Sequence, residues 1–265
     1  MKPVPLLCKI FDGTKREDAL EGPSNPKELA ISPQLNSNEL VTWIHRGPSD
    51  KLVICFSGIG KKADSCPGYE FARTASGDGQ HNVLFIADPN RTWLNGPGLL
   101  GRIRDEIDGF KARCEASRVI AMGHSMGGFS ALVAPSITRV HEVLAFAPQI
   151  SVHPEIVPDE SRWPIFRERI KLFEIVTAED YLQDDTNYTV IHGRHRLEAP
   201  QRERFPRQKN LRHYVMPLTH HNVPQRLKSK KCLSKVIDCA IEGRPRKLRL
   251  LLKDKARAIL LAQHS

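Results

Sequence analysis

The 265-residue sequence has no long hydrophobic run, and this absence narrows the class of protein at once. A membrane-spanning helix needs about 18 consecutive apolar residues, and no segment of this sequence approaches that length. The first residues, 1–9, carry charge but no sustained apolar stretch, and Leu7 stands where a lipoprotein signal ending before Cys8 would have a small residue. We therefore expect neither a transmembrane segment nor a signal peptide.

Closely spaced cysteines and metal-binding motifs are also missing. The six cysteines are Cys8, Cys55, Cys66, Cys114, Cys232 and Cys239. None of them forms a C-x-x-C pair, and the sequence contains no H-E-x-x-H motif and no Asp-rich loop. We expect reduced, structural thiols in a cytoplasmic protein that uses no metal and no other cofactor.

Acidic residues are scarce in the last part of the sequence. Residues 225–265 hold 12 Lys and Arg against 3 Asp and Glu, and residues 194–213 hold 7 against 2. Because the whole chain has a net charge of +10, the remaining residues sum to about −4. A basic segment of this kind can attract nucleic acid or anionic lipid, but solvated helix faces explain it more simply. Nucleic acid is not the expected partner, and weak peripheral membrane contact stays open.

Short apolar segments alternate with helical ones through the middle of the chain. The expected strands are residues 40–45, 51–56, 82–87, 118–122, 143–147, 188–192 and 211–216. The expected helices are residues 69–74, 99–116, 129–134, 166–173 and 224–241. Continuous apolar runs such as 51–56 are typical of strands covered on both faces. This alternation predicts βαβ units and a doubly wound, mostly parallel sheet.

Composition divides the chain into three parts. Residues 1–38, rich in Pro, Asn, Ser and charge, are expected to be irregular apart from a possible strand at 8–11. Residues 39–242 form the α/β domain, which a proline-rich insertion at about 150–187 interrupts. Residues 243–265 follow a Gly-Arg-Pro break and are expected to contain a basic helix over 247–263.

The most specific motif is Gly123-His124-Ser125-Met126-Gly127-Gly128. It follows an apolar strand and precedes a small-residue helix, which is the context of the G-x-S-x-G nucleophile elbow. The glycines are needed where a Cβ would clash with neighbouring backbone, and a hydroxyl at a helix N-terminus lies where negative charge is favoured. Ser125 is therefore the candidate nucleophile, whereas we expect His124 to be structural.

On these residues the chain resembles the α/β-hydrolase superfamily, in which this form of the elbow is common among esterases, lipases and thioesterases. The resemblance extends over roughly residues 39–233 in the order of elements. It implies the chain order nucleophile, acid, histidine. It also implies that the insertion at about 150–187 forms a lid over the active site.

The resemblance places the base on the loop after the last strand and the acid after the strand that ends at residue 192. The loop holds two candidates, His220 and His221, and we favour His221 because of its spacing to the next helix. Glu198 is the nearest carboxylate after residue 192. Glu155, Asp180 or the absence of a working acid are the alternatives.

An oxyanion hole needs two backbone N–H groups. The residue after the nucleophile, Met126, supplies one, and the loop after strand 51–56 supplies the other, from Ile59 or alternatively Gly58. Candidate substrate-binding residues follow the next strand and lie in the insertion: they are Asp88, Asn90, Trp93 and Trp163.

Together these residues predict a serine esterase or thioesterase that acts on a small-molecule or acylated substrate through an acyl-serine intermediate. The same residues could serve acyl transfer or the cleavage of an amide or C–C bond. A binding module that keeps the fold without catalysis, and uses its basic tail, is the alternative from another class.

Overall fold

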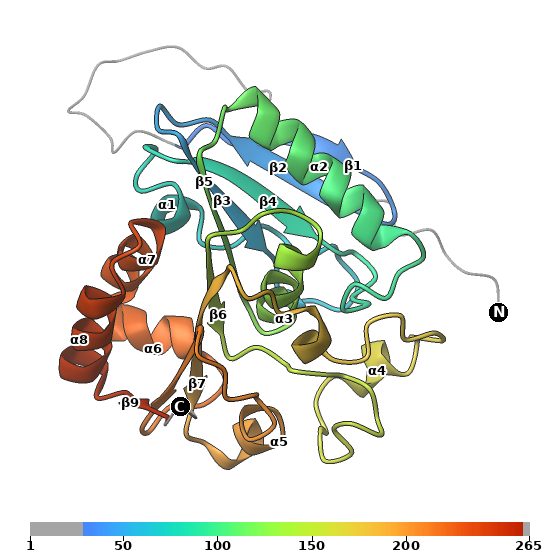
Figure 1. Ribbon diagram of the computed structural model, residues 1–265. Helices are drawn as coiled ribbons and strands as arrows, with labels where there is room; N and C mark the ends of the chain where they lie inside the picture. Colours follow the sequence, from blue (N-terminus) through green and yellow to red (C-terminus); the bar gives the residue numbers. More distant parts are fainter. Residues whose placement is uncertain (1–28, 262–265) are drawn as a thin grey trace, which may run out of the picture.

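A nine-stranded sheet forms the centre of the computed structural model, which describes residues 29–261 (Figure 1). The strands are β1 (Ser32–Asn36), β2 (Val41–His45), β3 (Lys51–Phe56), β4 (Asn82–Ala87), β5 (Arg118–His124), β6 (Glu142–Phe146), β7 (Asn187–Gly193), β8 (Leu211–Met216) and β9 (Ile259–Leu260). Their order in the sheet is β1-β2-β4-β3-β5-β6-β7-β8-β9. The neighbours from β4 to β8 pair in parallel, while β1, β2 and β9 are antiparallel to theirs. The expected doubly wound, mostly parallel sheet is confirmed.

Helices cover both faces of this sheet (Figure 1). The α-helices are α1 (Ala72–Ala75), α2 (Leu99–Arg113), α3 (Met126–Val133), α4 (Pro164–Arg167), α5 (Ala199–Arg202), α6 (Val223–Ser229), α7 (Leu233–Ile241) and α8 (Pro245–Ala256). Helices α2 and α3 pack in one apolar core, and α6, α7 and α8 pack in a second core on the opposite face. None of the helices within residues 29–261 is long and apolar enough to cross a membrane.

Strand β3 shows why a continuous apolar run folds as a central strand. Successive side chains of a strand point to opposite faces. Leu52, Ile54 and Phe56 belong to the core that contains α2 and α3, whereas Val53 and Cys55 belong to the other core. All five are buried because each face of the strand meets a helical layer.

The N-terminal and inserted segments differ from expectation. Strand β1 lies in the segment that we expected to be irregular, where it pairs with the edge strand β2. The possible strand at residues 8–11 lies outside the described residues. In the insertion, the expected helix over 166–173 is reduced to the single turn of α4, which ends at Arg167.

The C-terminal region also differs. The helix expected over 224–241 is divided into α6 and α7, with Lys231 in the left-handed region (φ 53°) between them. The final helix ends at Ala256 instead of residue 263, because Arg257 adopts a left-handed conformation (φ 53°). The chain then forms β9, which pairs antiparallel with β8 at the sheet edge.

Candidate active site

Ser125 lies at a sharp turn between β5 and α3 and has a left-handed φ of 59° with ψ −122°. A non-glycine residue with positive φ is strained and persists only where its surroundings require it. A Cβ at Gly127 would lie 2.1 Å from the carbonyl oxygen of Phe56, and one at Gly123 would lie 2.3 Å from the backbone of Gly127. The two glycines therefore let the turn pack against β3, which holds the serine at the carboxyl end of the parallel strands.

The acid and base candidates lie on the loops after β7 and β8. The carboxylate Oε2 of Glu198 lies 3.2 Å from Nδ1 of His221, and Glu198 is only 1% exposed. The two loops are held together because His195 donates its N–H to the carbonyl of Thr219 at 3.1 Å. Among the carboxylates considered from the sequence, the geometry favours Glu198, since Glu155 and Asp180 are exposed.

The neighbouring histidines distinguish the base candidate from its alternatives. His220 is exposed and stacks on His195, with 3.8 Å between the ring centroids. His124 instead donates from Nε2 to the carbonyl of His221 at 3.0 Å, since that oxygen can only accept. Burial lowers the pKa of His124 to about 4. A neutral His124 thus helps to position the loop that carries His221, as expected for a structural histidine.

Ser125 is 2% exposed and accepts a hydrogen bond from Nε2 of Gln149 at 3.2 Å. The amide of Gln149 is oriented by Trp93, whose indole N–H donates to Oε1 at 3.1 Å. Within residues 29–261, Nε2 of His221 is buried without a hydrogen-bond partner. No hydrogen bond therefore joins Nε2 of the base candidate to Ser125 in this arrangement, and Nε2 can accept a proton only in the tautomer whose ring proton lies on Nδ1.

Arg162, from the inserted segment, contacts both Glu198 and His221. Its Nη1 lies 2.6 Å from Oε1 of Glu198 and 2.9 Å from Nδ1 of His221. Its Nη2 and Nε contact the two oxygens of Glu160 at 2.6 and 2.8 Å. The guanidinium also lies 4.9 Å from the ring centroid of Trp163, and that ring lies 5.1 Å from His221. Two carboxylates, one guanidinium and one imidazole thus form a single network.

This network controls the charge of both carboxylates. Burial by itself raises the pKa of Glu198, but the hydrogen bond and charge of His221, together with Arg162, outweigh it and hold that pKa below its usual value. For Glu160, burial is likewise outweighed by its hydrogen bonds and ion pair with Arg162, so its pKa is also lowered. Both groups are therefore carboxylates at neutral pH, and Arg162 offsets one of the two negative charges.

The loop after β3 presents the candidate oxyanion donors. The N–H of Gly58 already points to Oε2 of Glu70, at 3.4 Å. Ile59 is held through its carbonyl, which accepts from Nε of Arg91 at 2.8 Å. Since Gly58 is engaged elsewhere, the arrangement favours the N–H of Ile59 as the partner of Met126, and their role stays a prediction.

The four candidate substrate-binding residues fall into two groups. Trp93 contacts Gln149 and lies 6.5 Å from Trp163 between ring centroids, so both lie beside the candidate catalytic residues, and their role in substrate binding stays a prediction. Asp88 accepts hydrogen bonds from Asn90 and Thr92 of its own loop. Asn90 also donates to the carbonyl of Asn38 at 2.8 Å. These contacts of Asp88 and Asn90 build the loop, and a substrate role for them stays a prediction, as does a lid role for the insertion.

Sequence reasoning missed three residues of this site: Gln149, Glu160 and Arg162. Gln149 follows β6 by three positions, so its place at the carboxyl end of a parallel strand could have been noticed. Glu160 and Arg162 lie in the irregular insertion, where no periodicity indicates which side chains turn inward. Only the tertiary fold reveals them.

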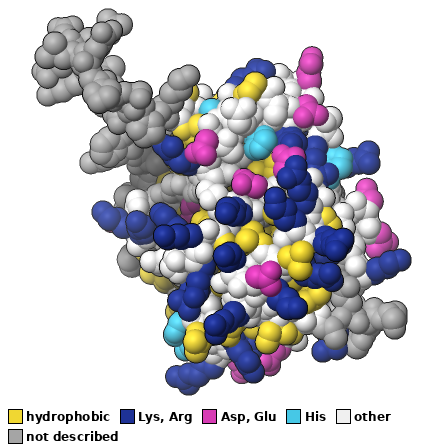
Figure 2. All heavy atoms as spheres, turned by 90° about the vertical axis from the view of Figure 1, so that its left-hand side faces the viewer, with side chains coloured by type: hydrophobic (Ala, Val, Ile, Leu, Met, Phe, Trp, Pro, Cys, Tyr) yellow, Lys and Arg dark blue, Asp and Glu magenta, His cyan; other side chains and the backbone are white. Residues whose placement is uncertain are grey.

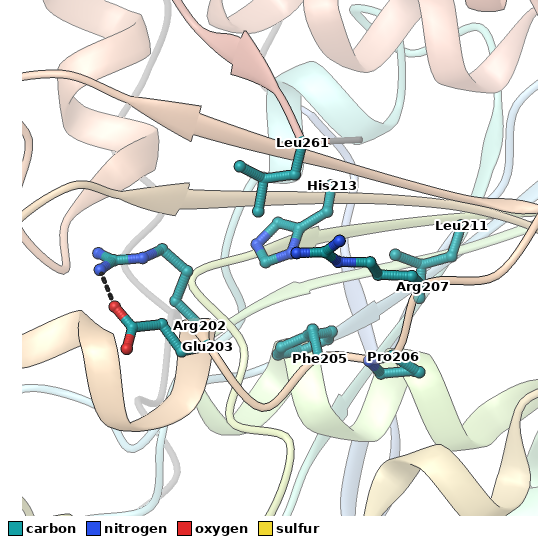
Figure 3. Close-up of a pocket in the computed structure, with 8 residues that line it drawn as sticks. All are labelled: Arg202, Glu203, Phe205, Pro206, Arg207, Leu211, His213 and Leu261. Carbon is teal, nitrogen blue, oxygen red and sulfur yellow. Dashed lines mark hydrogen bonds and ion pairs between the residues drawn. The ribbon is translucent and has the colours of Figure 1, made fainter. Parts of the chain in front are cut away.

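A separate pocket of about 230 Å³ lies beside β8, and no candidate catalytic residue lines it (Figure 3). Figure 3 shows His213 and Phe205 at its wall and the ion pair between Arg202 and Glu203 at its edge. In the part of the chain that the structure describes, no group of three or more His, Cys, Asp or Glu could hold a metal ion.

Comparison with solved structures identifies the fold. XC6422 from Xanthomonas campestris, described as an α/β serine hydrolase without lid, matches with a TM-score of 0.50 and 14% identity, over 84% of this chain and 97% of that chain. The chain has the α/β-hydrolase fold.

Two further structures are similar. Est1E from Butyrivibrio proteoclasticus has a TM-score of 0.55 and 14% identity, over 83% of this chain and 99% of its own. The capsule O-acetyltransferase of Neisseria meningitidis serogroup A has a TM-score of 0.55 and 14% identity, over 78% of this chain and 93% of its own. No protein-family model and no curated protein sequence matches the chain.

Proposed function

We propose that this protein is a serine hydrolase that cleaves a carboxylic ester or thioester through an acyl-serine intermediate. The observation that carries the proposal is the contact of Glu198 with Nδ1 of His221, next to a serine held at positive φ. The Nε2 atom of the same imidazole is buried and unpartnered within residues 29–261. A serine alcohol needs such an oriented base to become a nucleophile.

In the proposed reaction, Oγ of Ser125 attacks the acyl carbon while its proton passes to Nε2 of His221. Glu198 stabilises the imidazolium, and the N–H groups of Met126 and Ile59 hold the negative oxygen. Collapse of the tetrahedral adduct breaks the bond to the leaving alcohol or thiol, which takes the proton from His221. Water then attacks the acyl-serine by the same steps, releasing the carboxylic acid and restoring Ser125.

Covalent labelling with a fluorophosphonate probe tests the proposal. We expect labelling of the wild type and its loss in Ser125→Ala and His221→Ala. Ser136→Ala, an exposed serine, and His220→Ala, the adjacent exposed histidine, are matched controls and should label normally. A folded wild type that does not label, or a Ser125→Ala variant that still does, would reject the activated serine and favour a binding module.

Acyl transfer is the second candidate function. Ser125 is 2% exposed and contacts Gln149, whose amide is held by the buried Trp93, a setting that restricts water. One similar structure is also an O-acetyltransferase. Product analysis with competing alcohols separates the two functions: ester products formed in preference to the free acid would indicate transfer, whereas the free acid alone would indicate hydrolysis.

A further inference from the structure

A hollow of about 320 Å³ lies between β8, β9 and the first turn of α8, away from the candidate active site. Its lining residues are Arg212, Tyr214, Pro245, Arg246, Arg249 and Leu260. Arg212 and Tyr214 are two positions apart on β8 and therefore point to the same face of the sheet. Arg246 and Arg249 are three positions apart on α8 and share one side of that helix. Three arginines and one tyrosine from two elements thus line this β8–α8 hollow.

Two buried donors of the β8–α8 hollow lack acceptors within residues 29–261. Tyr214 is 1% exposed, and neither its hydroxyl nor Nη1 of Arg212 has a hydrogen-bond partner within residues 29–261, although both atoms are buried. Arg246 and Arg249 are exposed, and neither forms an ion pair with a carboxylate of that part of the chain. A buried donor without an acceptor is costly and rare, and the described residues supply no acceptor for these two atoms.

The electrostatics of the β8–α8 hollow favour an anion. Burial raises the pKa of Tyr214, against the opposing charges of Arg212 and Arg249, so the phenol keeps a proton to donate at neutral pH. The first turn of α8 has no side-chain cap and adds the positive end of its helix dipole. The acidic group near Arg212 is Glu142. Burial raises the pKa of Glu142 to about 7, although the charges of Arg212 and Arg118 act to lower it. Figure 2 shows Lys and Arg side chains gathered over this side of the molecule.

We propose that the β8–α8 hollow binds the phosphoryl group of a phosphate monoester. A phosphoryl group offers three acceptor oxygens and up to two negative charges, which matches donors that converge from a strand and a helix. A carboxylate has two oxygens and one charge, so it would leave part of this donor set unpaired. The exposed side chains of Arg246 and Arg249 can close over the anion, while Tyr214 and Arg212 form the buried floor.

Calorimetric titration with inorganic phosphate at constant ionic strength tests the site without reference to catalysis. We expect Arg246→Gln and Arg249→Gln each to raise the Kd for phosphate about tenfold, the effect of losing one charge-assisted hydrogen bond. Lys255→Gln removes the same charge from an exposed position on another side of α8, and should change the Kd little. Absence of phosphate binding, or an equal loss in Lys255→Gln, would overturn the proposal.

Tyr214→Phe supplies a second test, in which the stability of the protein should rise while its affinity for phosphate falls. Removing an unpaired buried hydroxyl should raise the Tm of the ligand-free protein by about 2–4 °C, while phosphate binding weakens. A variant with lower stability and unchanged phosphate affinity would show that the hydroxyl serves the fold instead of a ligand.

The same chemistry can come from a soluble metabolite or a lipid headgroup, and two further titrations separate these sources. Binding of glycerol 3-phosphate without binding to phosphatidylcholine vesicles that contain phosphatidic acid would assign the site to a soluble ligand. Vesicle binding that is lost in Arg249→Gln but kept in Lys255→Gln would assign it to a headgroup. Either result sustains the site, and binding of neither ligand would contradict it.

Discussion

Arg162 approaches Nδ1 of His221 to 2.9 Å, closer than the 3.2 Å that separates this nitrogen from Glu198. A guanidinium can only donate, so a hydrogen bond from Arg162 requires the lone pair of Nδ1 and places the ring proton on Nε2. In that tautomer His221 cannot accept the proton of Ser125. Proton transfer requires the other tautomer, in which Nδ1–H donates to Glu198. Arg162 therefore competes with Glu198 for Nδ1 of His221. The proton on this atom decides whether Nε2 of the proposed base can accept another.

Arg162→Met should destabilise the fold, because it leaves the carboxylates of Glu160 and Glu198 buried without their shared cation. Breaking a buried ion pair in this way costs about 3–5 kcal/mol, and the double variant Glu160→Gln/Arg162→Met should recover at least half of it. Urea denaturation measures the unfolding free energies of the wild type, Glu160→Gln, Arg162→Met and the double variant. Additive losses would show that the two residues are not coupled.

The double variant Glu160→Gln/Arg162→Met should also label faster with the fluorophosphonate probe. Without Arg162, Nδ1–H of His221 donates to Glu198 alone, and we expect the labelling rate to rise about tenfold, the effect of about 1.4 kcal/mol. Nitrogen-15 NMR of the His221 ring reports the tautomer independently of activity. If the double variant labels more slowly than the wild type although its ring proton lies on Nδ1, then Arg162 assists the reaction.

Gly127→Ala should disrupt the elbow. The added methyl group would lie 2.1 Å from the carbonyl oxygen of Phe56, which is backbone of a central strand and cannot move aside. We expect a loss of about 3 kcal/mol or more in unfolding free energy, together with loss of labelling.

Gly101→Ala is the matched control for this prediction. Nothing lies within 4 Å of its added Cβ, and Gly101 is inside α2. Because alanine favours a helix over glycine, the control should gain about 0.5–1 kcal/mol. Thermal unfolding of both variants checks the pair, and equal stability of the two would contradict the steric argument.

The buried histidine pair His192 and His213 should make the protein sensitive to acid. Their rings are joined by a 2.9 Å contact between Nδ1 of His192 and Nε2 of His213, and burial lowers the pKa of His213 to about 3. A histidine whose folded pKa lies below its unfolded value of about 6.5 stabilises the fold above pH 6.5 and loses that contribution as the pH falls.

Between pH 7 and pH 5 the loss should reach about 2 kcal/mol for His213 alone. Denaturation curves of the wild type and His213→Gln at both pH values measure it. The variant should show a smaller difference between the two pH values, and circular dichroism at pH 7 verifies that it is folded. An identical pH dependence in both proteins would exclude His213 as the sensitive group.

Local patterns were enough to predict the central part of the fold. The apolar runs around β3, β4 and β5 are continuous because helices cover both faces of the sheet, so strand type and parallel order follow from the sequence. The C-terminal elements were harder, because Arg257 ends α8 through its backbone conformation and no glycine or proline marks the position. Strand β9 then depends on the free edge of β8, which is a property of the assembled sheet.

The sequence by itself was enough to predict Ser125 as the candidate nucleophile, since the glycines of the elbow are required by local sterics of the strand–turn–helix unit. It also limited the candidate base to His220 or His221 and the candidate acid to Glu198, Glu155 or Asp180. Only the tertiary structure distinguishes these candidates, because the packing of the loops after β7 and β8 turns His221 and Glu198 toward each other and His220 toward solvent. Arg162 and Glu160 have no local signal for a place in the site: Glu160 pairs with Arg162 two positions away, but Arg162 reaches Glu198 across 36 residues of sequence, and folding alone brings those two together.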